Sequence, residues 1–114
     1  MKPERKIYFY KDYFIEFYNA LSQGSKKKLD YVLAKLRTEE RVVAKFVKSI
    51  REGIFELRVE HEGNIYRVFF IFDEGNIVVL FNGFQKKTQK TPSSEIEKAI
   101  RIKKEYYADK QQSS

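Results

Sequence analysis

Three strand-length runs separated by two short turns constrain the fold of this chain most strongly. The runs are residues 54–60, 65–72 and 77–84, and the turns between them are residues 62–64 and 73–76. In the first run apolar and charged side chains alternate, which is typical of a strand with two different faces. Connections this short join antiparallel neighbours, so the sequence predicts a three-stranded antiparallel meander.

In the first third of the chain, a short strand is followed by apolar residues at helical spacing. Residues 7–10 form an apolar run typical of a strand. Asp12 is a candidate N-cap for a helix with apolar residues at helical spacing, and Gly24 interrupts that pattern. Ser25 is a candidate cap for a second helix. The stretch before the meander admits a short helix over residues 41–46.

Thr91 is a candidate N-cap for a final helix, with Pro92 at the first helical position, where its missing N–H costs nothing. The element order is therefore strand, two helices, three strands and a helix. It predicts an α+β fold with a small, mainly antiparallel sheet and helices packed on one face. We expect a single domain over residues 1–110 and a frayed tail over residues 111–114.

Composition narrows the possible functions. The net charge of +7 favours a polyanionic partner, although surface lysines also serve solubility. The chain has no cysteine and one histidine, so we expect no disulfide, no metal site and no cofactor. It contains no apolar stretch of signal-peptide or membrane-span length, so we expect a cytoplasmic protein without membrane contact.

A cluster of cations follows the third run of the meander. The stretch FNGFQKKTQKTP places Lys86, Lys87 and Lys90 just after the aromatic Phe84. A phosphate-bearing partner is one explanation for the lysines, and protection of a strand end against edge pairing is another. Phe84 is a candidate base-stacking residue, with packing against the sheet as the alternative.

Two arginines on neighbouring strands are candidates for the same site. Antiparallel pairing through the first turn places Arg58 and Arg67 within a few residues of register. The planar fork of arginine suits a phosphate because it can donate two hydrogen bonds at once. For this role both side chains must share the sheet face away from the helices. The alternative for Arg67 is an ion pair with Glu56 or Glu60.

The motifs GIFELRVEHEGNIYRVFF and GNIVVLFNGFQKKTQKTPSSEIEKA resemble the RelE/ParE superfamily of bacterial toxins, and within it the phage-derived HigB-like branch. The resemblance covers residues 53–107 by motif and residues 6–46 by the order of elements. It implies a RelE-like fold and a ribosome-dependent mRNA endonuclease that works without metal. It also implies a partner, a small helix-turn-helix antitoxin that inhibits the toxin of this type II toxin–antitoxin pair.

The resemblance also implies roles for individual residues. Arg67, in the motif YRV, matches the arginine that contacts the scissile phosphate in RelE-type toxins. Lys86 or Lys87 matches the basic position after the last strand, and Arg58 would assist. Ile54 and Glu56 stand where RelE toxins have strand lysines near the nucleophile, so the general base is not identified.

Three further residues are weaker candidates. His61 has a side chain whose ordinary pKa is near neutrality, which suits an acid or base, but a hairpin tip accepts any polar residue there. Tyr66 could stack on a base, with packing on the sheet as the alternative. Near the end of the chain, Tyr106 and Tyr107 lie close to the position of the terminal tyrosine of these toxins.

Two other functions fit the same fold. One is a ParE-like protein that poisons DNA gyrase. The other is a module that binds RNA or its antitoxin without cutting, which the residues at Ile54 and Glu56 favour because a strand lysine is missing at each. Cleavage of mRNA on the ribosome is the leading hypothesis, with Arg67 and Lys86 on the phosphate.

Overall fold

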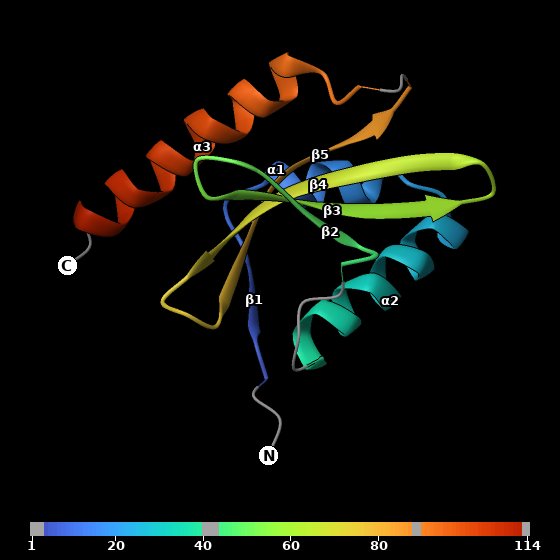
Figure 1. Ribbon diagram of the computed structural model, residues 1–114, viewed down its shortest axis with the longest axis horizontal. Helices are drawn as coiled ribbons and strands as arrows, with labels where there is room; N and C mark the ends of the chain where they lie inside the picture. Colours follow the sequence, from blue (N-terminus) through green and yellow to red (C-terminus); the bar gives the residue numbers. More distant parts are fainter. Residues whose placement is uncertain (1–3, 40–43, 88–89, 113–114) are drawn as a thin grey trace.

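The computed structural model describes residues 4–39, 44–87 and 90–112, which form a five-stranded sheet and three helices (Figure 1). The order in the sheet is β1-β5-β4-β3-β2. Strand β1 runs parallel to β5, and the other neighbours are antiparallel, which confirms the predicted fold class. The elements are β1 (Lys6–Phe9), α1 (Tyr13–Asn19), α2 (Gln23–Thr38), β2 (Val47–Arg51), β3 (Ile54–His61), β4 (Asn64–Asp73), β5 (Ile77–Lys86) and α3 (Ser93–Gln112).

Tight turns built on Glu-Gly pairs join the four antiparallel strands. In each turn, both residues of the pair have positive φ angles, between 49° and 81°. This backbone matches the right-handed twist of a hairpin, and glycine adopts it without steric cost. The two turns of the meander confirm the sequence prediction. The third pair, Glu52-Gly53, joins β2 to β3 and makes the meander one strand longer than predicted.

Strand β2 (Val47–Arg51) follows directly after the stretch in which a short helix over residues 41–46 was expected. Residues 41–43 lie outside the described residues, and residues 44–46 form a turn that leads into the strand. The helix prediction is therefore wrong for residues 44–46. The strand is difficult to recognise because it lies at the sheet edge and buries little of its length, so its side chains are mostly polar.

The helices cover both faces of the sheet, so the prediction of helices on one face is wrong. Helices α1 and α2 pack through Phe14, Leu29 and Val32 on the face that carries Leu57 and Val68. The opposite face packs against α3, as Figure 1 shows for the arrangement of α2, the sheet and α3. In this second layer the buried residues of α3 are Ala99, Ile100 and Ile102.

The start of α2 (Gln23–Thr38) differs from the prediction in a way that involves His61. The N-cap is Ser22, whose Oγ accepts a hydrogen bond from the Ser25 backbone N–H at 3.2 Å. Ser25 is buried inside the helix, where its hydroxyl donates to Tyr66 at 3.1 Å. Gly24 does not interrupt the helix. The His61 ring occupies the space that a Cβ at this position would need.

Helix α3 (Ser93–Gln112) begins just after Pro92, and Thr91 does not act as the predicted cap. The Thr91 hydroxyl instead donates a hydrogen bond to Glu56 Oε2 at 2.9 Å. The helix continues to Gln112, two residues into the tail that we expected to be frayed. None of the described helices is long and apolar enough to cross a membrane.

A β-bulge in β5 adjusts the register of the sheet near the end of this strand. Val68 pairs with Gly83, while Phe70 pairs with Leu80, so β5 has one residue more than β4 in this interval. The bulge presents Gly83 to helix α1, where a Cβ would overlap the ring of Phe17. Glycine is therefore required here by space, without any unusual φ angle.

We predict that Gly83→Ala destabilises the protein by about 1–3 kcal/mol, because the added methyl group overpacks the contact with α1. Chemical denaturation measures the change in the free energy of unfolding. The double variant Gly83→Ala/Phe17→Leu should recover part of the loss, since the smaller side chain vacates the space. This explanation would be contradicted if the double variant lost as much free energy of unfolding as Gly83→Ala alone, or lost the sum of the two single changes.

Candidate functional site

Three rows of paired residues carry charged side chains on the α3 face of the sheet. The register places Lys48 opposite Glu56, Arg58 opposite Arg67, and Ile65 opposite Lys86. Directly paired residues in an antiparallel sheet project from the same face. We call Lys48, Glu56, Arg58, Arg67 and Lys86 the cationic cluster. The structure thus brings together three of the predicted site residues, Arg58, Arg67 and Lys86.

Glu56 lies at the centre of the cationic cluster. Its side chain is 2% exposed, and its Oε1 atom lies 3.0 Å from Arg67 Nε and 3.6 Å from Arg58 Nε. The other carboxylate oxygen accepts the hydrogen bond from Thr91. A buried carboxylate is tolerated only with such partners. The ion pair with Arg67 is the structural alternative that the sequence left open, and Glu56 orients both guanidinium groups.

The two arginines differ in how far solvent reaches them. The side chain of Arg67 is 9% exposed, whereas that of Arg58 is 39% exposed. Arg67 also donates from one terminal nitrogen to the carbonyl of Tyr66 at 3.0 Å. The Nε atoms of both arginines are buried and lie near Glu56 without a well-aligned hydrogen bond among the described residues. Arg58 therefore offers the guanidinium group that a phosphate can reach first.

Lys86 is the member of the cationic cluster with a shifted pKa. Burial lowers the pKa of its ammonium group, and the positive charges of Arg67, Arg58 and Lys48 lower it further, against the attraction of Glu56. A bound phosphate would relieve this repulsion. A lysine with a lowered pKa also gives up its proton more readily, which suits an acid for a leaving oxygen.

Phe84 borders the cationic cluster, and Tyr66 does not. Phe84 pairs with Arg67 across the sheet and packs on Phe69 with ring centroids 5.6 Å apart, but it keeps part of its ring exposed. A partly exposed ring beside arginines is suited to stack on a base. Tyr66 projects from the other face and is buried against Phe17, so it is a core residue in this structure.

His61 and Lys87 make no ion pair with the cationic cluster within the described part of the chain. His61 lies at the end of β3 on the α2 face, against Gly24, opposite the face of the arginines. Its Nε2 atom is 3.8 Å from Glu62. Lys87 and Lys90 are exposed in the connection between β5 and α3. A role for His61 in proton transfer stays a prediction that this geometry does not support.

Tyr106 and Tyr107 lie at the opposite end of the sheet. Both hydroxyls donate to Asp73, the last residue of β4, at 2.6 Å and 3.4 Å. Lys110 donates to the same carboxylate at 2.7 Å. Burial alone would raise the pKa of Asp73, but the hydrogen bonds from Lys110 and Tyr106 lower it overall. Burial and the bond to Asp73 raise the pKa of Tyr106 to about 12. These tyrosines fasten α3 to the sheet.

From the sequence, Glu56 is expected only as a possible ion-pair partner of Arg67, and Lys48 is not identified as a member of this site. Glu56 stands two residues before Arg58, which places both side chains on one face of a strand, so a signal was present for it. Lys48 joins the site only through the pairing of β2 with β3, and that strand itself was missed.

The fold and the site together define the class of protein: a small α+β protein whose mainly antiparallel sheet carries a cationic cluster around a buried carboxylate. Residues 16–104, more than half of the chain, match the family described as "Phage derived protein Gp49-like (DUF891)". The chain therefore belongs to this phage-derived Gp49-like family, which is related to toxin–antitoxin systems.

The chain is also similar to a protein of Haemophilus influenzae that is described as an uncharacterized protein. The two are 46% identical over 43 residues, which are 38% of this chain and 42% of that protein. The match spans less than half the length of this relative, so it supports relatedness and carries no activity.

We predict that Lys86→Met does not lower thermal stability at neutral pH and raises it slightly, because the change removes a positive charge from among three others. The lowered pKa means that the protonated lysine opposes folding. The advantage of Met should therefore shrink as the pH rises towards the ordinary lysine pKa of 10.5, where the wild-type ammonium loses its proton.

Thermal melts of wild type and Lys86→Met across that pH range measure this difference. Lys87→Met is the matched control. Lys87 is the exposed neighbour of Lys86, so its replacement should change the melting temperature little at any pH. A clear loss of stability in Lys86→Met at neutral pH would contradict the charge argument.

Proposed function

We propose that this chain is the toxin of a type II toxin–antitoxin pair and that it cleaves mRNA bound to the ribosome. The observation that carries the proposal is the pairing of Arg58 with Arg67 beside Lys86, all on one sheet face and next to the partly exposed Phe84. Membership of a toxin–antitoxin-related family supports the toxin role. The RelE- and HigB-like character suggested by the sequence motifs supports the choice of RNA as substrate.

The chemistry begins with attack of a 2′-hydroxyl on the adjacent phosphorus. The exposed Arg58 contacts the phosphate directly, and the buried Arg67 supplies a second positive charge below Arg58. Glu56 fixes the positions of both side chains. Fixed cations stabilise the negative charge that develops on the phosphorane. Lys86 gives a proton to the leaving 5′-oxygen, which yields a 2′,3′-cyclic phosphate and a 5′-hydroxyl.

The proton of the 2′-hydroxyl passes to solvent water, since no carboxylate of the cationic cluster faces the substrate. Glu56 is buried under two arginines and Thr91, so its oxygens face protein groups and not a substrate. Alignment of the hydroxyl with the phosphorus by the ribosome would lower the barrier through geometry. Dependence on the ribosome is therefore part of the proposal, with the antitoxin as the partner that inhibits it.

A second candidate function is binding without cleavage, to RNA or to the antitoxin. The burial of Arg67 favours it, because a guanidinium with 9% of its side chain exposed contacts phosphate only after a local rearrangement. In this case the cationic cluster would give salt-sensitive affinity and no cut product.

The test is cleavage of a defined mRNA by the purified protein, with and without programmed ribosomes. We predict ribosome-dependent cuts that fall by about 10²-fold or more in Arg58→Ala, which removes the accessible phosphate contact. Arg51→Ala is the matched control: this arginine is 50% exposed and pairs with Glu97 outside the cationic cluster, so cleavage should persist.

Circular dichroism of each variant separates loss of activity from loss of fold. RNA that binds without being cut by a folded wild-type protein would favour the second candidate. If neither binding nor cleavage occurs and gyrase is trapped on DNA instead, the RNA proposal is wrong and the ParE-like alternative gains support.

A further inference from the structure

The outer edge of β1 (Lys6–Phe9) has unusual surroundings. Within residues 4–39, 44–87 and 90–112, this strand pairs only with β5. The backbone N–H of Lys6 donates to the turn before β5 at 3.0 Å, and that of Tyr10 donates to Leu80 of β5 at 3.3 Å. Alternate residues of a strand bond to the same neighbour, so the backbone groups of Ile7 and Phe9 face outward.

Aromatic side chains make this edge apolar on both faces. Tyr8 is 50% exposed on the α3 face, and Phe9 is 43% exposed on the other. Exposed edge strands usually carry charged residues or proline, which prevent pairing with another chain. An edge with two half-exposed aromatic rings is therefore suited to accept a strand.

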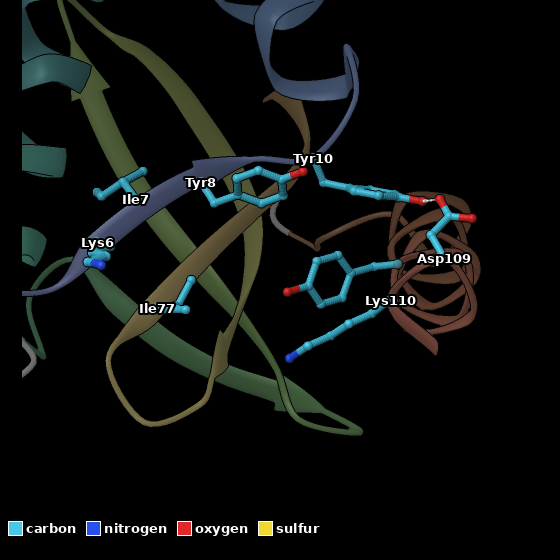
Figure 2. Close-up of a pocket in the computed structure, with 8 residues that line it drawn as sticks. Lys6, Ile7, Tyr8, Tyr10, Ile77, Asp109 and Lys110 are labelled. Carbon is cyan, nitrogen blue, oxygen red and sulfur yellow. Dashed lines mark hydrogen bonds between the residues drawn. The ribbon is translucent and has the colours of Figure 1, made fainter. Parts of the chain in front are cut away.

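One hollow lies on each face of this edge. On the α3 face, a pocket of about 480 Å³ is lined by Tyr8, Tyr10, Ile77 and Tyr106, and its charged residues are Lys6, Asp109 and Lys110. Figure 2 shows Tyr10 reaching from β1 to Asp109 at the far end of this pocket. On the other face, a groove of about 230 Å³ is lined by Ile7, Phe9, Asp30, Leu33, Ala34 and Arg37.

The two hollows match the geometry of an added strand. Successive side chains of a strand project to opposite faces, so a segment paired with β1 would direct alternate side chains into the pocket and the groove. Both hollows are lined mainly by apolar side chains. A segment paired with β1 should therefore carry apolar side chains at successive positions.

Charge selects the flanks of the segment. Residues 5–11, which contain β1, carry the cations Arg5, Lys6 and Lys11 and no carboxylate, although Lys11 pairs with Glu105 and Asp109 of α3 at 3.1 Å and 3.8 Å. No ion-pair partner of Lys6 is present in the part of the chain that the structure describes. The whole chain has a net charge of +7, so an acidic segment would be attracted to this edge and a second basic copy would be repelled.

We propose that the outer edge of β1 binds an extended segment of a partner protein, apolar at its centre and acidic at its ends, as an added strand. The proposal concerns the outer edge of β1, which lies beyond β5 and away from β3 and β4, and it is independent of RNA cleavage. If the chain is the toxin proposed above, the antitoxin is the partner that would supply this segment.

The probe is a short labelled peptide with alternating valine and leucine residues between pairs of glutamates, added to the full-length protein. Fluorescence anisotropy measures its dissociation constant. We predict that Tyr8→Lys weakens binding by roughly tenfold or more, because a lysine on the edge replaces an apolar contact and repels strand pairing. Tyr31→Lys is the matched control, since Tyr31 is 49% exposed on α2 and lines neither hollow.

Two further measurements make the test specific for strand pairing. Hydrogen exchange at the Ile7 and Phe9 amides should slow when the peptide binds. N-methylation of alternate peptide amides should abolish binding of the peptide. Equal affinity for the N-methylated peptide, or no binding by the folded wild-type protein, would overturn the proposal. So would self-association in sedimentation that Tyr8→Lys removes, or displacement of the peptide by RNA. Unchanged ribosome-dependent cleavage in Tyr8→Lys keeps this result separate from the proposed nuclease function.

Discussion

The ion pair of Glu56 with Arg67 is the interaction on which the arrangement of this face depends. The carboxylate contacts residues on two strands, and through Thr91 it also contacts the segment that leads into α3. Removal of a buried partner leaves an uncompensated charge, which costs several kcal/mol. The same group therefore joins the sheet to the start of a helix and sets the direction of the two guanidinium groups.

This arrangement explains how several positive charges are held together on one face of the sheet. Lys86 lies on the same face, in the row next to that of Arg58 and Arg67, and burial together with the neighbouring positive charges lowers its pKa. Such repulsion opposes folding, and an incoming phosphate would remove it. A site that is strained without its ligand gains more from binding than a neutral surface does, because binding relieves an existing penalty.

The meander was predictable because its signals are local. Alternating side chains and glycine turns lie within a few residues, and they also place Arg58 opposite Arg67. Strand β2 was not predictable in the same way, since an edge strand buries few residues and lacks a clear apolar period. The periodicity of α3 identifies an apolar side but not the sheet face that this side covers.

The roles of Glu56, His61 and the terminal tyrosines show a second limit. Sequence spacing indicates the strand face on which a residue projects, but not what the opposite elements place there. His61 packs into the space left by Gly24, and Tyr106 bonds to Asp73 at the end of the sheet far from the arginines.

The two ends of the α3 face consequently have different physical characters. At one end, charged groups outnumber their partners and remain partly open to solvent. At the other end, tyrosine hydroxyls and a lysine saturate Asp73, and the helix is fastened. Helix α3 is held to the sheet at its C-terminal half, and Thr91, just before its start, bonds to Glu56. This division assigns stability to the aromatic end and leaves the charged end free to bind.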